Sequence, residues 1–248
     1  MDSIKTRRTI RKYKQTAVDD VLLNQLLELS ARTQTMGNLQ LYSVVITRDE
    51  EQKRRLSPAH FGQPMVTSAP VVLTICADFN RTSEWCRQRK AAPGYDNFLS
   101  FINAASDALL FTQTFSCLAE EAGLGVCYLG TTVYQPQQII EVLGLPRLVM
   151  PIATLTVGWP DEEPALSDRL PLASFVHEET YRDYSPADID KYYSPKECLP
   201  ENQHFVEINH KETLAQVFAE IRYTKKDNEA LSQLFLDTLR KQGFLSSL

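Results

Sequence analysis

The stretch NFLSFINAASDALLFTQTFSCLAEEAGLGVCYLG, residues 97–130, decides the fold. Residues 97–122 predict one long helix, because apolar side chains dominate and Asp107 is the only charge before the last turn. A helix that is apolar nearly all round must be covered all round, so we expect its own sheet and a second subunit to cover it. Gly123 is typical of a helix end, and the VCYLG that follows predicts a short strand.

Helices and strands alternate on both sides of this stretch. Asp19 and Asp20 precede the helical repeat of leucines in residues 21–32 and supply an acidic start. Strands are predicted at residues 41–47, 68–78 and 150–160, and short helices at 49–57 and 136–144. This alternation indicates an α/β or α+β layered fold in which helices flank a mixed central sheet.

The composition changes after Pro160. Residues 178–200 show no clear periodicity, and two helices are expected at about 210–222 and 227–242. This tail has too few apolar residues to form its own core. We therefore expect a single domain over residues 1–248, with a core to about residue 175. Residues 176–248 are then an extended C-terminal arm with helices, wrapped around the body or around a partner subunit.

Charge and length exclude several classes of protein. The net charge is −5, although residues 1–16 contain six Lys and Arg against Asp2, so the rest of the chain is acidic and argues against nucleic-acid binding. No apolar stretch follows the basic start, so no secretory signal is expected. Polar residues interrupt residues 98–119, which favours a buried helix over a membrane span. We expect a cytoplasmic protein.

Cysteine and histidine spacing indicates neither disulfides nor a metal site. The five cysteines form no C-x-x-C pair, and the four histidines lack the spacing of metal ligands. There is also no G-x-S-x-G elbow, Walker loop or H-E-x-x-H motif. Because no acid, base or nucleophile stands out, a bound cofactor that performs the chemistry is the economical explanation.

Three stretches carry candidate ligand-binding residues. In RRTIRKY, residues 7–13, Arg7, Arg8 and Arg11 can hold a dianionic phosphate, the alternative being a solvated charge run. In TMGNLQ, residues 35–40, a glycine permits a tight turn and two amide side chains suit a polar ring edge, although an ordinary turn has the same composition. Residues 129–131 follow a predicted strand end, where ligands commonly bind.

Two further features qualify these candidates. The glycines at 123 and 125 do not form the dinucleotide fingerprint, because the third position is Tyr128 and the order is helix then strand. Arg169, in SDRLP at residues 167–171, is a lone loop cation that is either a surface residue or a second phosphate ligand.

Nine short motifs occur in an order that resembles the flavin-dependent nitroreductase family. They are RRTIRKY, GNLQ, FGQ (61–63), AGLGVCYLG, LGLP, VGWPDEEP, RLP, HEETY and KQGF. The resemblance covers almost the whole chain. Within the family, the chain more closely resembles the branch of oxygen-insensitive NADPH nitroreductases and NADPH–flavin oxidoreductases.

The resemblance implies an α+β nitroreductase-like fold that forms a homodimer with FMN at the subunit interface. It implies ping-pong transfer of hydride from NADPH or NADH to small acceptors such as nitroaromatics, quinones or flavins. The flavin then reacts and no side chain is catalytic. One alternative is another redox task on the same fold, such as enoate reduction or dehalogenation. The other is a non-catalytic flavin-binding protein. The colour of the purified protein and its bleaching by NAD(P)H distinguish the enzyme from this second alternative.

The resemblance also implies which residues bind the cofactor. They are Arg7, Arg8, Thr9 and Arg11 at the phosphate and ribityl end; Thr35, Gly37, Asn38 and Gln40 near the partner's flavin; Gln63 at the pyrimidine edge; Tyr128, Leu129, Gly130 and Thr131 along the ring; and Ser167 and Arg169 at the phosphate.

Three features depart from the family's pattern. TQTMGN, residues 33–38, stands where the family often has a serine run before the first strand. Ser167 stands where the family often has a lysine, and Ser232 stands near the branch's arginine for the NADPH 2′-phosphate. Arg222, Lys225 or Lys226 could replace that arginine, so the choice between NADPH and NADH stays open.

Overall fold

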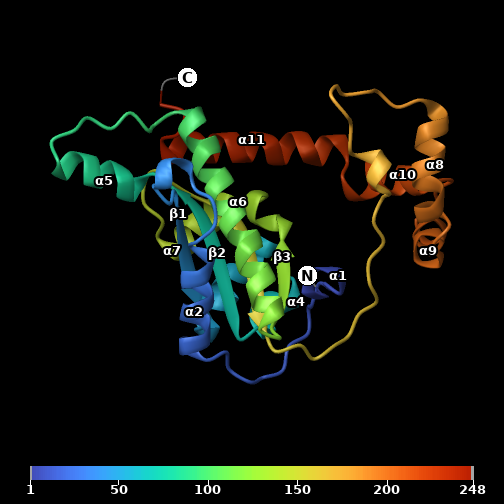
Figure 1. The fold of residues 1–248 in the computed structure, drawn as a ribbon, viewed down its shortest axis with the longest axis horizontal. Coiled ribbons are helices and arrows are strands. Elements are labelled where there is room, and N and C mark those ends of the chain that lie inside the picture. Colours follow the sequence, from blue (N-terminus) through green and yellow to red (C-terminus); the bar gives the residue numbers. More distant parts are fainter. Residues whose placement is uncertain (1, 247–248) are drawn as a thin grey trace. The chain divides into compact units, whose positions relative to one another are not determined.

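The computed structural model describes residues 2–246, which fall into two compact units (Figure 1). One unit comprises the chain up to Ala165 together with the residues from Leu231 onward, and the other comprises Leu166–Ala230. Helix α11 (Lys225–Gln242) begins in the second unit and ends in the first. The arm expected at residues 176–248 therefore overlaps the second unit only in part.

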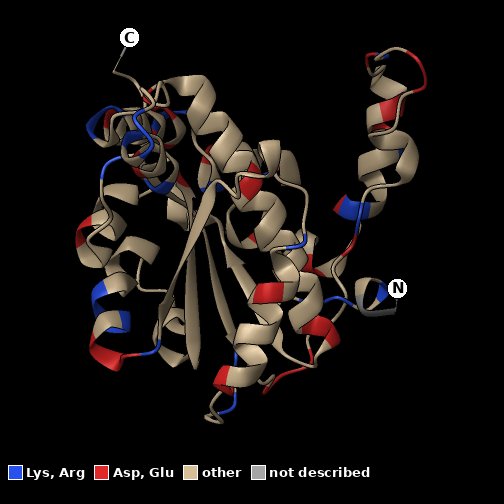
Figure 2. Cartoon of the chain, turned by 60° about the vertical axis from the view of Figure 1, so that its left-hand side comes forward, with Lys and Arg blue, Asp and Glu red and all other residues tan. Residues whose placement is uncertain are grey.

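The first unit is built on a four-stranded sheet in the order β1-β2-β4-β3. The strands are β1 (Tyr42–Thr47), β2 (Val71–Asp78), β3 (Gly125–Leu129) and β4 (Val149–Gly158), and every neighbouring pair is antiparallel. Apart from Asp78 the strands carry no charged residue, and charges lie on helices and loops (Figure 2).

The expectation of a mixed sheet is wrong for these strands. Strands β2 and β3 run in the same direction, but β4 lies between them and is antiparallel to both. Within residues 2–246, parallel pairing occurs only at an isolated bridge between Thr9 and Val126.

Helix α6 (Phe98–Glu121) confirms the long helix predicted from the sequence. The Asn97 side chain caps its start by accepting a hydrogen bond from Ser100 N at 3.0 Å. At its end Gly123 has a φ of +83°, and Leu124 N donates to Ala119 O at 2.9 Å. This is the left-handed helix end that favours glycine.

Helix α6 buries one side against the sheet and leaves another uncovered in the single chain. The buried side includes Phe101, Ala104, Asp107, Ala108, Phe111 and Phe115. On the opposite side Leu99 is 68% exposed, and Ile102, Leu109 and Leu110 are 43–45% exposed. These four residues are called the α6 apolar face below.

Helices cover both faces of the sheet. On one face the predicted helix α2 (Asp20–Ser30), which Asp19 caps, packs with α6 in the main apolar cluster. On the other, a second cluster includes residues of the N-terminal segment and Cys127. The remaining helices of this unit are α1 (Asp2–Lys5), η1 (Met36–Asn38), α3 (Glu50–Leu56), η2 (Ser57–His60), α4 (Pro64–Ser68), α5 (Asn80–Gln88), η3 (Gly130–Val133) and α7 (Pro136–Leu143).

The second unit contains helices that the sequence pattern did not show. Its elements are η4 (Leu172–Ser174), α8 (Pro186–Glu197), α9 (Pro200–Ile208), α10 (Leu214–Gln216), a π-helical turn η5 (Val217–Arg222) and the start of α11. Helix α8 lies in the tract expected to lack periodicity, and a capping box of Ser185 and Asp188 starts it. No helix of the described residues is long and apolar enough to cross a membrane.

Candidate functional site

The N-terminal segment runs along the edge strand β3. Ile10 N donates to Val126 O at 3.1 Å, and Lys14 N donates to Trp159 O at 2.9 Å. The segment can approach this closely because residue 125 is glycine: a Cβ there would lie 2.7 Å from Ile10. Gly125 therefore serves the contact between two segments of the protein rather than the approach of a ligand.

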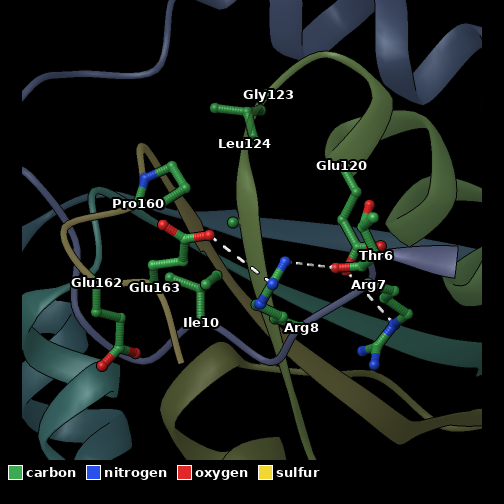
Figure 3. Close-up of a pocket in the computed structure, with 11 residues that line it drawn as sticks. Thr6, Arg7, Arg8, Ile10, Glu120, Gly123, Leu124, Pro160, Glu162 and Glu163 are labelled. Atoms are coloured by element: carbon green, nitrogen blue, oxygen red, sulfur yellow. Dashed lines mark hydrogen bonds and ion pairs between the residues drawn. The ribbon is translucent and has the colours of Figure 1, made fainter. Parts of the chain in front are cut away.

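A pocket of about 350 Å³ opens beside this segment (Figure 3). Within it Arg7 Nε lies 3.4 Å from Glu120 Oε1, and Arg8 Nη2 lies 3.8 Å from Glu163 Oε1. Its lining residues are Thr6, Arg7, Arg8, Ile10, Glu120, Gly123, Leu124, Gly125, Pro160, Glu162 and Glu163. The pocket thus combines two of the three predicted arginines with carboxylates.

Arg8 has an unused hydrogen-bond donor in this pocket. Its Nη1 donates to Thr6 O at 3.0 Å, but its buried Nε has no hydrogen-bond partner among the described residues. A buried donor without a partner is unfavourable and an anionic oxygen would satisfy it. This orphaned guanidinium nitrogen fits a phosphate ligand.

The carboxylates of the pocket were missed as functional residues in the sequence. Burial raises the pKa of Glu120, and the neighbouring Arg7 partly offsets that rise. Glu162 Oε1 accepts hydrogen bonds from the backbone N–H groups of Arg11 and Lys12, the latter at 3.0 Å, and so orients the segment. The sequence does show two acidic pairs, residues 120–121 just before Gly123 and residues 162–163 after VGWP. The arginines that lie beside these carboxylates are far away in the sequence.

Arg11 is not among the residues that line this pocket. Burial raises the pKa of the Cys127 thiol, and the nearby Arg11 and Arg7 guanidinium groups partly offset that rise. Arg11, like Arg7, therefore lies near Cys127 on β3, and the predicted phosphate clamp of the three arginines stays a prediction.

The end of β3 presents an open backbone. Tyr128 is 44% exposed, Leu129 is buried, and no heavy atom of the described protein would lie within 4 Å of a Cβ on Gly130. Thr131 Oγ1 forms a hydrogen bond of 2.9 Å with His60 Nδ1, and His60 O accepts from Gln63 N at 3.2 Å. Gln63 is thus linked to Thr131 only through His60, and its predicted place at the pyrimidine edge stays a prediction.

The loop of residues 35–40 is organised around a buried carboxylate on α6. Asp107 accepts hydrogen bonds from Thr35 Oγ1 at 2.6 Å, Met36 N at 2.9 Å and Leu41 N at 3.1 Å. Thr35 Oγ1 in turn accepts from Gln40 N at 2.8 Å. The Thr35 hydroxyl is therefore engaged inside the protein.

The same loop has an unusual backbone. Gly37, Asn38 and Gln40 have φ values of 57°, 56° and 54°, in the left-handed region. The turn predicted from Gly37 is confirmed, and it extends over two further residues.

The predicted site residues do not meet in one place within a single chain. Residues 35–40 precede β1 and residues 128–131 end β3, and β1 and β3 are the two edges of the sheet. Three strand spacings separate these edges, about 14 Å. The predicted place of residues 35–40 near a partner's flavin stays a prediction.

Ser167 and Arg169 belong to the second unit. There Arg169 Nη1 donates to Asp168 O at 2.7 Å, and the Asp168 carboxylate lies 2.9 Å from Lys196 Nζ on α8. Their predicted role at the phosphate stays a prediction.

The fold and the site define an α+β protein whose antiparallel sheet is covered on both faces and carries a cationic segment along one edge. The model of the nitroreductase family matches residues 4–159, and the chain belongs to that family. It is an oxidoreductase of the nitroreductase and FMN reductase type.

Relatives agree with this assignment. FMN reductase [NAD(P)H] of Bacillus subtilis is 33% identical over 184 residues, 72% of this chain and 73% of that protein. Oxygen-insensitive NADPH nitroreductase of Salmonella typhimurium is 29% identical over 185 residues, 75% of each chain. A solved structure from Bacteroides fragilis NCTC 9343 has 61% identity and a TM-score of 0.98, covering 99% of this chain and 100% of that one.

Proposed function

We propose that this protein binds FMN without a covalent bond and transfers hydride from NADPH or NADH to small electron-poor acceptors by a ping-pong mechanism in the cytoplasm. The acceptors are nitroaromatics, quinones or flavins. Relatives named FMN reductase and NADPH nitroreductase support the cofactor and the electron donor. The five free cysteines suit a reducing compartment. Bound FMN would supply the hydride chemistry.

The observation that carries this proposal is the unpaired Nε of Arg8 on a segment that runs beside β3, the strand that ends at the open Gly130. FMN has a dianionic phosphate at one end and a flat ring at the other. In this proposal Arg7, Arg8, Thr9 and Arg11 hold the phosphate and the ribityl chain.

The residues at the end of β3 would hold the ring. The open surface at Gly130 lets a planar group approach the backbone, and Tyr128 presents a half-exposed side chain beside it. A backbone N–H of Gly130 or Thr131 would stabilise negative charge that develops on the ring. Gln63 supplies donors and acceptors for the pyrimidine edge. No protein base is needed, so these side chains orient rather than react.

The proposal includes a homodimer. The loop that holds Thr35, Gly37, Asn38 and Gln40 lies at the opposite sheet edge, so a second copy would supply it to complete each site. The α6 apolar face offers a surface for this contact. Ser167 and Arg169 would add to the phosphate end.

Gly130→Ala tests the proposed ring position. Among the described residues, leaving aside residue 130 and its two chain neighbours, no heavy atom lies within 4 Å of the new methyl group, so we expect the thermal stability of the apoprotein to be unchanged. FMN binding should weaken by about 1–3 kcal/mol because the methyl group would occupy the place of the ring. Gly94→Ala, which also meets no atom within 4 Å, is the matched control. Fluorescence titration with FMN measures both.

The outcome of this titration is decisive for the cofactor. Equal FMN affinity for Gly130→Ala and Gly94→Ala would place the ring elsewhere. A colourless wild-type protein that takes up no FMN would overturn the proposal as a whole.

Steady-state kinetics test the reaction. Initial rates with NADH and NADPH against a panel of quinones, nitroaromatics and free flavins should give parallel double-reciprocal lines, as a ping-pong mechanism requires. Turnover only with enoates or halogenated compounds would favour the alternative redox tasks of this fold. Bound FMN that NAD(P)H does not bleach would indicate a flavin-binding protein without catalysis.

A further inference from the structure

His60 is fully buried, and its ring makes one hydrogen bond and has one unused nitrogen. It ends η2, and its Nδ1 lies 2.9 Å from Thr131 Oγ1. Its Nε2 is buried and has no hydrogen-bond partner among the described residues. Burial lowers the pKa of His60 to about 4, so its ring is neutral at neutral pH.

Packing alone does not explain a histidine at this place. A buried ring nitrogen without a partner is unfavourable, and an aliphatic side chain would fill the space without that cost. The polar contact that the His60 ring makes is the one to Thr131. A role for the residue therefore has to be sought in what Thr131 does.

Thr131 belongs to the short η3 segment that follows β3 and begins at Gly130. The next residue holds this segment to the sheet: Thr132 Oγ1 donates to Leu129 O at 2.8 Å and lies 2.9 Å from Thr154 Oγ1 on β4. The hydrogen bond between Thr131 and His60 holds the same segment to a second element, η2. Gly130 itself has no side chain with which to fix its backbone. Two side-chain contacts from different elements thus determine where that backbone lies.

We propose that His60 is a positioning residue of the flavin site. Through the Thr131 hydroxyl it holds the Gly130–Thr131 backbone in place, so that the N–H donors of this backbone face the ring in both the oxidised and the reduced state. This inference rests on the proposed function, because it assumes that FMN occupies the open surface at Gly130.

The test uses the FMN-loaded enzyme and removes each partner of the hydrogen bond separately. His60→Leu removes the ring nitrogens, and Thr131→Val removes the hydroxyl while keeping the shape of the side chain. His60→Asn is the conservative variant, since its amide lies as many bonds from Cβ as Nδ1 does. Thr47→Val, in the buried end of β1, is the control for the same substitution at a threonine outside the site.

The readouts are the visible spectrum of the bound flavin, its reduction potential, and kcat and KM for NAD(P)H. We expect His60→Leu and Thr131→Val to shift the spectrum and the potential alike. Both should lower kcat by about tenfold to a hundredfold, with little change in KM. The double variant should be no worse than either single variant, because both remove one hydrogen bond. His60→Asn should restore most of the loss.

The results separate this inference from the proposed function. Wild-type enzyme that neither holds FMN nor takes it up refutes the proposed function, and this inference with it. Wild-type enzyme that is reduced normally, with Thr131→Val indistinguishable from Thr47→Val, refutes the positioning role alone. If His60→Leu does not fold, Thr131→Val and His60→Asn still decide the question: we expect a large loss in Thr131→Val and a small one in His60→Asn, and a loss in His60→Asn as large as that in Thr131→Val would count against the positioning role.

Discussion

Arg8 is held more weakly inside the protein than its neighbour Arg7. Its ion pair with the exposed Glu163 spans 3.8 Å, whereas Arg7 lies 3.4 Å from the nearly buried Glu120. Arg8 can therefore turn to a ligand without leaving a buried carboxylate unpaired. Arg7 cannot.

Arg8→Ala should consequently weaken FMN binding and leave the apoprotein folded. A charge-assisted contact to phosphate contributes about 1.5–3 kcal/mol, which is roughly a tenfold to hundredfold change in the dissociation constant. Fluorescence titration with FMN measures it. Arg54→Ala removes an exposed arginine paired within α3 and should bind FMN as the wild type does. Wild-type affinity in Arg8→Ala would contradict the clamp.

The buried imidazole of His60 predicts a specific dependence of stability on pH. In the unfolded chain the ring takes up a proton near pH 6.5, but in the folded protein only near pH 4. The unfolded state therefore binds more protons between these values. Folding stability is retained in full above pH 6.5 and falls as the pH drops to 4, by about 3 kcal/mol from this group.

Urea unfolding of the apoprotein between pH 7 and pH 4 checks this dependence at fixed protein concentration. His60→Asn should flatten the acid side of the stability profile, because the titrating group is gone. His204→Asn replaces an exposed histidine and should follow the wild-type profile. Parallel profiles for wild type and His60→Asn would show that His60 does not titrate as stated.

Among the elements, the loop of residues 35–41 depends most on a single distant residue. Asp107→Leu would leave the Thr35 hydroxyl and the N–H groups of Met36 and Leu41 without their acceptor. We expect a loss of about 3 kcal/mol or more in the free energy of unfolding. Chemical denaturation measures it. Asp107→Asn keeps one acceptor oxygen and should lose less; equal stability of Asp107→Leu and wild type would contradict this account.

Elements with strong local signals were predictable from the sequence. Helix α2 has leucines at helical spacing behind a capping aspartate, and α6 is apolar between Asn97 and Gly123. Helix α8 was missed because its side chains are mostly polar and Pro195 lies inside it. The mixed sheet was wrong because the insertion of β4 between β2 and β3 depends on contacts that no local pattern records.

The candidate site was predictable where its residues form a compact motif. The arginine segment, residues 7–13, is one continuous stretch that lies beside β3. Residues 128–131 are another continuous stretch, at the end of β3. His60 and Glu120 were missed because their significance depends on partners 71 and about 110 residues away along the chain. Pairing across such distances follows from the tertiary fold, which residue spacing does not report.

At the scale of the whole molecule, the α6 apolar face predicts self-association. Leu109→Arg would place a charge on this face, where Leu109 is 44% exposed in the single chain. We expect the wild type to sediment as a dimer and this variant to shift toward monomer. It should also lose FMN, because the second copy no longer supplies residues 35–40. Val21→Arg, on exposed α2 surface, is the control; a dimeric, FMN-replete Leu109→Arg would refute the interface.

The reliance of one loop on Asp107 also bears on the biogenesis of this protein. The donors that Asp107 binds lie 66 to 72 positions earlier in the chain, so the loop cannot reach its final shape until the middle of α6 has been synthesised and has docked. During translation, residues 35–41 must wait while more than sixty further residues leave the ribosome. In the proposed function, where FMN binding needs this loop, coenzyme capture then comes late in the life of each nascent chain.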